Sequence, residues 1–434
     1  MNFTTTLNAP RPNGIEYLPV IRVCPTGIST GDQRTRCFPD TISESDVTDW
    51  VTSIPGTHWF IGNEPDRPDH LLTGQDATEP ALYAQHYHDL YQIIKAADPT
   101  ASVLAGSIVQ PTEVRIKYLD LILAAYREQY GAPMPVDGWS IHNYVLNERS
   151  CDHFSVYECW GADIPPGVSD ISGLVIDAQQ NDDFSLFVAQ IERFRAWMAQ
   201  NGYRNTPLFL SEFGVLMPEG IGFDPDFTPA RVNTFMNKTF DYLRSKTDAA
   251  VGYPADGNRL VQRFSWYSTT DNNFNGRLFE PDTKQLTAIG TNFANYVAPI
   301  ALEADFYPIR LSTQPTIPMS SGDPISVTLQ ADIANSGNTL TAYDVRVQFY
   351  QGDPEDGGVQ IGSDQIVSLA GCGDTQTASV IWETAPVGVT PIYVKVSPVN
   401  PATAPESSEA GANNVSMYSL SVGTETTYLP LIDR

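Results

Sequence analysis

The chain has 434 residues and a hydrophobic content of 41%, which is enough for one large domain and a smaller one with a full core. Its 51 acidic and 25 basic residues give a formal net charge of −26, which argues against a nucleic acid or an anionic membrane as partner. A neutral ligand such as a glycan fits this charge better. The plainer alternative is that the acidity keeps an exported protein soluble.

In chain order, residues 1–6 form a short apolar, extended fragment that we interpret as the end of a strand. A buried strand is expected from Ile15 to Val23. A helix from Ser43 to Ser53 opens with a Ser-x-x-Asp capping pattern.

Two short apolar runs each deliver a glutamate. The run from Trp59 to Ile61 is too short for a helix and ends at a glycine, which predicts a buried parallel strand with Asn63 and Glu64 at its C-terminal tip. The strand Leu208 to Phe213 ends in the same way and carries Glu212. Two glutamates at strand ends are the minimum set of residues for cleaving a glycosidic bond.

Strands and helices alternate through the first two thirds of the chain. Further strands are expected near 102–108, 136–144 and 260–267, and helices near 80–96, 112–130, 184–201, 229–245 and 286–296. This alternation predicts a parallel sheet with right-handed crossovers. We count seven strands where a TIM barrel needs eight, so we expect a barrel over residues 1–300 with its first strand missing.

Alternating strands replace the helical periodicity after about Leu302. The segments Ile325 to Ile333 and Val345 to Tyr350 are typical of an antiparallel, immunoglobulin-like sandwich, which we place at residues 303–424. The tail at 425–434 is too short to cross a membrane.

Five cysteines are present, and four of them fall into two short local loops. We therefore predict the disulfides Cys24 to Cys37 and Cys151 to Cys159, with Cys372 left over. Unconnected thiols in a cytosolic protein are the alternative, and metal binding is less favoured because no CxxC or clustered His spacing occurs. The cysteines favour an extracellular or cell-surface protein, although no signal peptide and no apolar run of ~18 residues is visible.

The stretch Asn63-Glu64-Pro65, with Glu212 about 150 residues later, resembles glycoside hydrolase clan A. Within that clan, the strand around Pro19 and the strand end at His142 and Tyr144 most resemble the glycosyl hydrolase family of fungal alkali-sensitive-linkage proteins, which includes endo-β-1,3-glucanases. The resemblance implies that Glu64 ends the fourth strand and is the acid/base. It also implies that Glu212 ends the seventh strand and is the nucleophile.

Other residues are candidates for substrate contacts. Asn63 is expected to bond the sugar 2-hydroxyl, and His142 and Tyr144 to orient Glu212. Trp266, at the end of the eighth strand, offers a face for stacking a sugar ring, and Trp160 is a weaker candidate for this task. Three of the candidate residues have a plainer interpretation. Glu64 could be an ordinary loop carboxylate, His142 a core histidine, and Trp266 part of the barrel packing. Asp66 and Arg67 lie near the site without an assigned role.

Residues 305–422 resemble the cell-adhesion-related domain of bacteria, called CARDB, through turn signatures that include Asn335 to Asn338. Turn signatures support a fold better than a function.

The leading hypothesis is therefore a secreted or surface-exposed bacterial retaining glycosidase that acts on a β-linked polysaccharide, with β-1,3-glucan as first choice. A second hypothesis keeps the same mechanism but has mannan, xylan or galactan as the substrate. A third is a non-catalytic glycan-binding or adhesion protein built on a degenerate barrel. The two-carboxylate mechanism implies no metal or cofactor. We expect a polysaccharide partner, no nucleic acid and no membrane insertion, and the sequence leaves the oligomeric state open.

Overall fold

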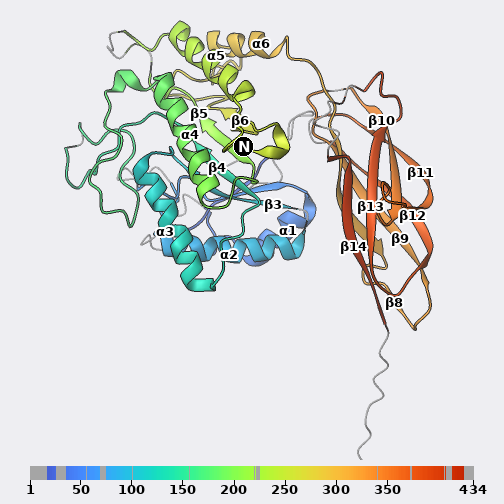
Figure 1. The fold of residues 1–434 in the computed structure, drawn as a ribbon. Coiled ribbons are helices and arrows are strands. Elements are labelled where there is room, and N and C mark those ends of the chain that lie inside the picture. Colours follow the sequence, from blue (N-terminus) through green and yellow to red (C-terminus); the bar gives the residue numbers. More distant parts are fainter. Residues whose placement is uncertain are drawn as a thin grey trace, which may run out of the picture. The chain divides into compact units, whose positions relative to one another are not determined.

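The computed structural model describes residues 17–25, 36–54, 56–68, 75–99, 101–155, 157–218, 220, 225–339, 341–371, 374–404, 406 and 413–424. From residue 18 onward, the described residues divide into two compact units, the first over 18–300 and the second over 301–424 (Figure 1). The predicted strand fragment at residues 1–6, the leftover Cys372 and the tail at 425–434 lie outside the described residues.

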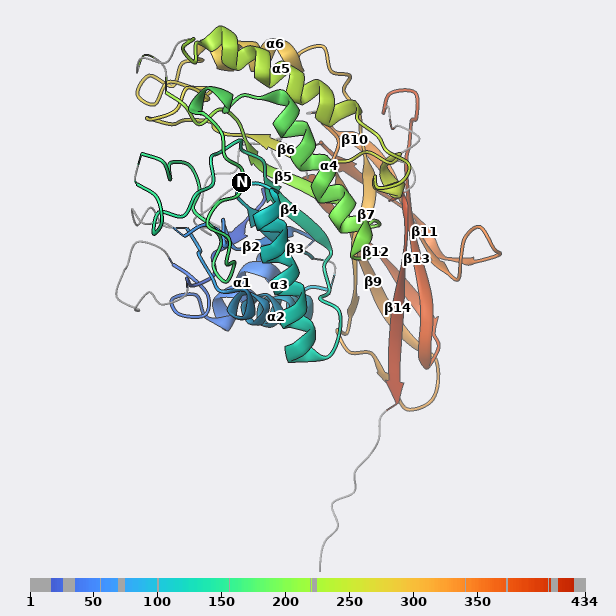
Figure 2. The ribbon, with the colours of Figure 1, turned by 60° about the vertical axis from the view of Figure 1, so that its left-hand side comes forward.

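The first unit is built on a parallel sheet of six strands in sequential order. The strands are β1 (Val20–Ile21), β2 (His58–Ile61), β3 (Ser102–Ile108), β4 (Gly138–His142), β5 (Leu208–Phe213) and β6 (Arg263–Trp266). A helix follows each strand: α1 (Glu44–Ser53), α2 (Pro80–Ala97), α3 (Glu113–Tyr130), α4 (Phe184–Gln200), α5 (Pro229–Ser245) and α6 (Ala288–Val297). The helices form an outer layer (Figure 2), so the described part of this unit is a TIM-like half-barrel.

The side chains of β2 show how the sheet separates two cores. Successive residues of a strand point to opposite faces, so Trp59 and Ile61 pack into the large cluster that contains the helices. Phe60 points the other way and meets Val20 of β1, along with buried side chains of β3 and β5. The concave face is therefore filled by side chains from several strands.

The helices begin and end where the sequence signals them. Ser43 caps α1, because its Oγ accepts from the amide of Asp46 and the Asp46 carboxylate accepts from the amide of Ser43, at 3.1 and 2.9 Å. Helix α3 ends at Gly131, whose φ of 68° lies in the left-handed region that favours glycine.

Three predicted strands are shorter than expected, and the first of them shows why. Of the predicted strand Ile15 to Val23 the structure describes residues 17–23, and among these only Val20–Ile21 is assigned as strand, because β1 pairs in register with β2 through these two residues. Strands β4 and β6 also lose residues at both ends, where the chain leaves the ladder for loops.

The second unit consists of two sheets around one core. One sheet has the order β11-β10-β13-β14-β8 and the other β12-β9-β7. The strands are β7 (Phe306–Gln314), β8 (Met319–Ser320), β9 (Ile325–Asn335), β10 (Tyr343–Gln351), β11 (Val359–Leu369), β12 (Asp374–Ala385), β13 (Gly388–Pro398) and β14 (Val415–Thr424). Alternate residues of β9, from Val327 to Ile333, are buried against β10 and β13 residues of the same core.

Among the described residues, no helix has both the length and the apolar character needed to cross a bilayer.

Candidate active site

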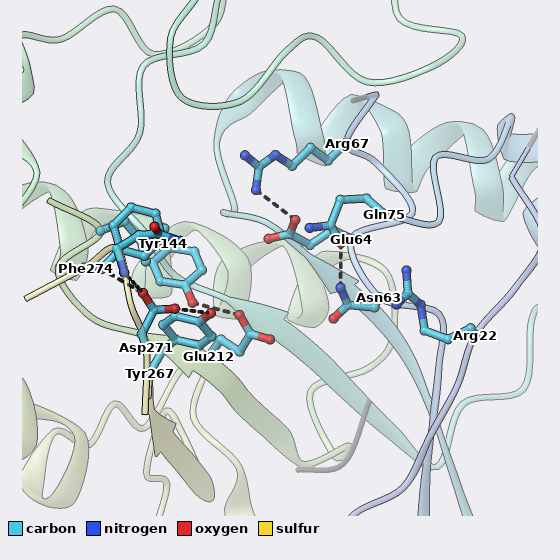
Figure 3. A pocket seen from close by; sticks show the side chains of 12 residues that line it. Arg22, Asn63, Glu64, Arg67, Gln75, Tyr144, Glu212, Tyr267, Asp271 and Phe274 are labelled. Atoms are coloured by element: carbon cyan, nitrogen blue, oxygen red, sulfur yellow. Dashed lines mark hydrogen bonds and ion pairs between the residues drawn. The ribbon is translucent and has the colours of Figure 1, made fainter. Parts of the chain in front are cut away.

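The predicted site residues meet at the carboxyl ends of the parallel strands. Asn63 and Glu64 follow β2. His142 is the last residue of β4 and Tyr144 lies two residues beyond it, and Glu212 is the penultimate residue of β5. Strands that run in the same direction bring their ends to one edge of the sheet, which is where barrel enzymes place their catalytic groups. The cavity at this edge has a volume of about 540 Å³ and is lined by Arg22, Asn63, Glu64, Arg67, Gln75, Tyr144, Glu212, Leu216, Tyr267, Asp271, Asn273 and Phe274 (Figure 3).

Glu64 and Glu212 form a buried carboxylate pair. Their side chains are only 3% and 11% exposed, and an oxygen of one lies within 4.8 Å of an oxygen of the other. Between them is His142, whose Nδ1 lies 3.2 Å from Oε1 of Glu64 and 3.5 Å from Oε2 of Glu212. The ends of β2 and β5 thus place Glu64 and Glu212 beside the same histidine, His142.

Each carboxylate has a further partner of its own. The Arg67 guanidinium donates from Nη1 to Oε2 of Glu64 at 3.0 Å. The Tyr144 hydroxyl donates to Oε2 of Glu212 at 2.7 Å. The two glutamates therefore have different electrostatic environments: Glu64 lies beside a cation, and Glu212 lies beside a neutral phenol.

The backbone holds Glu64 in an uncommon conformation. Its φ is 46°, in the left-handed region that non-glycine residues rarely adopt, and its amide donates to the carbonyl of Ser107 at 3.0 Å. Asp66 fixes the next turn, since its carboxylate accepts from the amide of Val109 and from Arg115. Residues in sparsely populated conformations persist where the surroundings determine them, as they do here.

The pKa values reflect these surroundings. Burial works to raise the pKa of Glu64, but the charge of Arg67 and the contacts of His142 overcome it and hold that pKa at about 2. Burial raises the pKa of Glu212, and the nearby charge of Glu64 adds to this, while His142 and Tyr144 oppose it. The order of these two pKa values is the reverse of the one expected from the sequence, in which Glu64 carries the proton.

Burial alone would lower the pKa of His142, but Glu212 and Glu64 raise it above its usual value. Its Nε2 is buried without a hydrogen-bond partner. His142 is thus placed to bridge the two carboxylates through Nδ1 alone.

Asn63 is held rigidly at the cavity wall. Its amide donates to Oδ2 of Asp76 at 2.8 Å, and its Nδ2 donates to Oε1 of Gln75 at 2.7 Å. The same Asp76 accepts from Nε of Arg22 at 2.6 Å. The Oδ1 atom of Asn63 is buried and has no partner, so this side chain retains an acceptor.

The prediction that Trp266 stacks on a sugar is corrected by its placement. The ring is 8% exposed, donates from Nε1 to the carbonyl of Gly276 at 2.7 Å and packs edge-to-face on Phe213 within the core. The aromatic rings that line the cavity belong to Tyr144, Tyr267 and Phe274, and Tyr267 is the residue that follows Trp266. Neighbouring strand residues face opposite sides, so an error of one position moves the ring from the cavity to the core. Trp160 packs in part against buried residues and does not line the cavity either.

Sequence reasoning assigned no role to several cavity residues, among them Arg67, Gln75, Tyr267 and Asp271. Asp271 accepts from the Tyr267 hydroxyl at 3.2 Å and from the backbone of its own loop. Arg67 stands three residues from Glu64, which is the one signal in the sequence that could have pointed to it.

Both predicted disulfides are confirmed. Cys24 pairs with Cys37, and Cys151 pairs with Cys159. The second closes a loop beside the cavity, because the carbonyl of Gly161, two residues later, accepts from Nη2 of Arg67 at 3.0 Å.

The same acids could also hold a cation. Of the described residues, only Glu64, His142 and Glu212 bring three metal-ligating atoms within 4.8 Å of one another. One imidazole and two carboxylates are a donor set that suits several divalent transition metals.

No protein-family model and no curated protein matches the chain. Among solved structures, it is similar to a GH128 (subgroup II) endo-beta-1,3-glucanase from Sorangium cellulosum, with a TM-score of 0.39 and 16% identity over 67% of this chain and 85% of that one. It is also similar to a hyperthermophilic endo-beta-1,4-glucanase, with a TM-score of 0.30 and 14% identity over 57% of this chain and 63% of that one. A CARDB domain from Pyrococcus furiosus has a TM-score of 0.20 and 19% identity over 29% of this chain and 95% of that one.

Proposed function

We propose that this chain is a retaining glycoside hydrolase that cleaves a β-linked polysaccharide. The observation that carries the proposal is the carboxylate pair at the ends of β2 and β5, with oxygens within 4.8 Å of each other. Retaining enzymes hold their carboxyl groups about 5 to 5.5 Å apart, whereas inverting enzymes need about 6.5 to 9.5 Å to admit a water. The spacing therefore favours attack by a protein carboxylate.

In the proposed reaction, Glu212 attacks the anomeric carbon while Glu64 gives its proton to the glycosidic oxygen. The bond to the leaving sugar breaks, and a glycosyl ester forms on Glu212. Glu64, now ionised, then removes a proton from water as the water attacks the ester, and the free Glu212 carboxylate is restored.

The neighbours of the pair support these roles. The Tyr144 hydroxyl at 2.7 Å donates to Glu212 and stabilises the charge that a nucleophile needs. Asn63 retains a buried acceptor at the cavity wall, which suits a sugar hydroxyl. Tyr267 takes the stacking role first given to Trp266, since its ring lines the same cavity.

The order of the two pKa values favours a second assignment in which Glu212 is the acid and Glu64 the nucleophile. Azide rescue of alanine variants separates the two. Azide attacks in place of the missing nucleophile and gives an inverted glycosyl azide, whereas it replaces water in an acid/base variant and gives a retained one. We expect the inverted product from Glu212→Ala and the retained product from Glu64→Ala; the opposite pattern exchanges the roles.

We propose β-1,3-glucan as the first candidate substrate on the basis of the sequence resemblance, with mannan, xylan and galactan as alternatives. We further propose an eight-stranded barrel followed by an immunoglobulin-like sandwich. The two disulfides support an oxidising environment such as the cell surface.

The test is reducing-end release from β-1,3-, β-1,4- and mixed-linkage glucans, mannan, xylan and galactan. Glu64→Gln and Glu212→Gln should abolish the activity, while Glu192→Gln on the exposed side of α4 is the matched control and should retain it. Silence on every polymer, with glycan binding retained, would instead support the non-catalytic hypothesis.

A further inference from the structure

The cavity has a polar wall and an aromatic wall. Figure 3 shows Asn63 and Gln75 on one side of it and Tyr144, Tyr267 and Phe274 on the other. The first two residues follow β2, and the aromatic residues follow β4 and β6. A pyranose ring has hydroxyls around its edge and C–H bonds on its faces, so it can bond to a polar wall and pack on an aromatic one.

A single carboxylate, that of Asp271, fixes two of the three aromatic residues. Its Oδ2 accepts from the Tyr267 hydroxyl at 3.2 Å. Its Oδ1 accepts from the amides of Asn273 and Phe274 at 2.6 and 2.9 Å. One oxygen therefore holds the ring of Tyr267, and the other holds the backbone that carries Phe274.

The base of the same loop is fixed by contacts that do not involve Asp271. The amide of Asn275 donates to the carbonyl of Met217 at 3.1 Å, and Nε1 of Trp266 donates to the carbonyl of Gly276 at 2.7 Å. These contacts anchor the loop at both ends, to β6 and to the loop after β5. Losing the Asp271 carboxylate should therefore free residues 271–274 and leave the rest of the loop in place.

The ring of Tyr267 connects this loop to the carboxylate pair. It packs edge-to-face on the ring of Tyr144, with centroids 6.2 Å apart and an angle of 85° between the planes. The Tyr144 hydroxyl in turn donates to Glu212 at 2.7 Å. A sugar that packs on the aromatic wall therefore lies next to the catalytic carboxylates.

Asn273 adds a polar group to the same loop. It is exposed and lines the cavity, and only its backbone amide bonds to Asp271. No described residue bonds to its side-chain amide, which offers two N–H donors and one acceptor. Ligand pockets commonly combine apolar walls with a few polar groups of this kind, which fix the orientation of the ligand.

Resting on the proposed hydrolase function, we propose that the loop after β6 forms a sugar-binding subsite and that Asp271 is its positioning residue. Tyr267 and Phe274 pack on one pyranose unit of the glycan, and the side chain of Asn273 bonds to its hydroxyls. Asp271 acts through these residues and not through the sugar, because both of its oxygens are already bonded within the loop.

The first test measures sugar binding without cleavage. Calorimetry follows the binding of four trisaccharides, of β-1,3-linked glucose, β-1,4-linked glucose, mannose and xylose, to the Glu212→Gln protein. We expect Asp271→Ala to weaken Kd by about 10- to 30-fold for the trisaccharide that binds. Asp271→Asn should restore most of the affinity, because its oxygen still accepts from the two amides and its NH2 group can donate to the Tyr267 oxygen.

Asp282→Ala, in the exposed turn before α6 and outside the cavity lining, is the matched control and should leave Kd unchanged. An unchanged Kd in Asp271→Ala overturns the proposal. An equal loss in the alanine and asparagine variants also overturns it, because the charge would then act on the sugar itself.

The second test asks whether Asp271 acts through the two rings. In protein that carries Tyr267→Leu and Phe274→Leu, adding Asp271→Ala should weaken Kd further by less than about 2-fold, since no ring is left to position. A further loss as large as in the parent protein overturns the proposal. Thermal melts show that each variant is folded. In the active enzyme, Asp271→Ala should raise KM more than it lowers kcat, because the loop bonds to neither glutamate.

The binding measurement also separates this proposal from the hydrolase function. Protein that binds a trisaccharide but cleaves no polymer counts against the hydrolase function, and the Asp271 variants still decide whether the subsite exists. Protein that cleaves a polymer but loses no affinity in Asp271→Ala keeps the hydrolase function and lacks the subsite. Protein that binds none of the four trisaccharides contradicts the subsite.

Discussion

At the scale of single residues, the hydrogen bond from Tyr144 stabilises the charge of the buried Glu212 carboxylate. The Glu212 side chain is 11% exposed, and burial raises its pKa. The phenol donates at 2.7 Å to Oε2, and the hydroxyl itself is buried. A hydrogen bond to an ionised group is worth about 1.5 to 3 kcal/mol, which offsets part of the burial.

Replacing this phenol should therefore slow the reaction. We expect Tyr144→Phe to lower kcat by about 10- to 100-fold, which is the kinetic equivalent of losing one such bond to the nucleophile. Tyr296→Phe is the control, because its hydroxyl donates to Asp241, away from the cavity, and not to a catalytic group. Steady-state kinetics on the active polymer checks both variants, with thermal melts to show that each is folded; a kcat equal to wild type in Tyr144→Phe counts against the role.

The same scale shows which parts of the site the sequence could predict. Glu64, Glu212 and His142 could be expected to lie together because each is at the end of a short apolar strand, and the ends of parallel strands converge. Trp266 was misplaced because a strand period of two turns a one-residue error into the opposite face. Arg67 had no assigned role, since it follows the strand in a loop whose course no periodicity describes.

At the scale of elements, α4 supports the wall of the site. Asn143, at the end of β4, donates from Nδ2 to the carbonyl of Phe187, and Gln190 donates from Nε2 to the carbonyl of Tyr144 at 2.9 Å. The backbone that carries His142 and Tyr144 is therefore tied to one face of this helix. The stability of α4 and the geometry of the site depend on each other.

The cap of α4 tests this dependence. Asp183 accepts from the amides of Ser185 and Leu186 at 2.8 and 3.2 Å, and losing such a cap costs about 1 kcal/mol. Burial acts to raise the pKa of Asp183, but the hydrogen bond from the Ser185 hydroxyl and those from the two amides outweigh it and lower that pKa below 3.8. The stabilisation is therefore present above pH 3.8 and is lost as the pH falls through the lower folded value.

We expect Asp183→Ala to be less stable than wild type by about 1 kcal/mol at neutral pH, with a smaller difference in acid. Urea unfolding at both pH values measures it, and Asp152→Ala in an exposed turn is the control. A difference that stays constant into acid would contradict a cap by the ionised carboxylate.

Among the elements, the long helices were predictable and the short strands less so. The helical period persists over 17 or 18 residues in α2 to α5, and the caps mark their ends, so the predicted bounds of these helices differ from the observed ones by one residue at most. Strand β6 keeps four residues of a predicted eight, because it pairs with β5 only from Arg263 to Trp266. Where a ladder stops depends on the neighbouring strand, which the local sequence does not encode.

At the scale of the whole molecule, each unit has a core of its own. The large cluster of the first unit and the cluster of the second have no member in common. A change inside one core should therefore act on that unit alone.

Leu329, fully buried in the second unit, offers such a change. We expect Leu329→Ala to destabilise this unit by about 2 to 5 kcal/mol through the cavity it leaves. Calorimetry of the full chain should show one transition at lower temperature and another in place, and glycan cleavage below both transitions should be unaffected. A joint shift of both transitions would show that the units unfold together.

The account depends most on the two carboxylates acting as a retaining pair, and the stereochemistry of the first product tests this directly. Proton NMR of the early reaction on the polymer that the wild type cleaves distinguishes the anomers before they equilibrate. The account predicts that the β-anomer appears first and the α-anomer only later, by mutarotation. Initial release of the α-anomer would contradict it, because inversion requires a water between two acids that lie within 4.8 Å of each other.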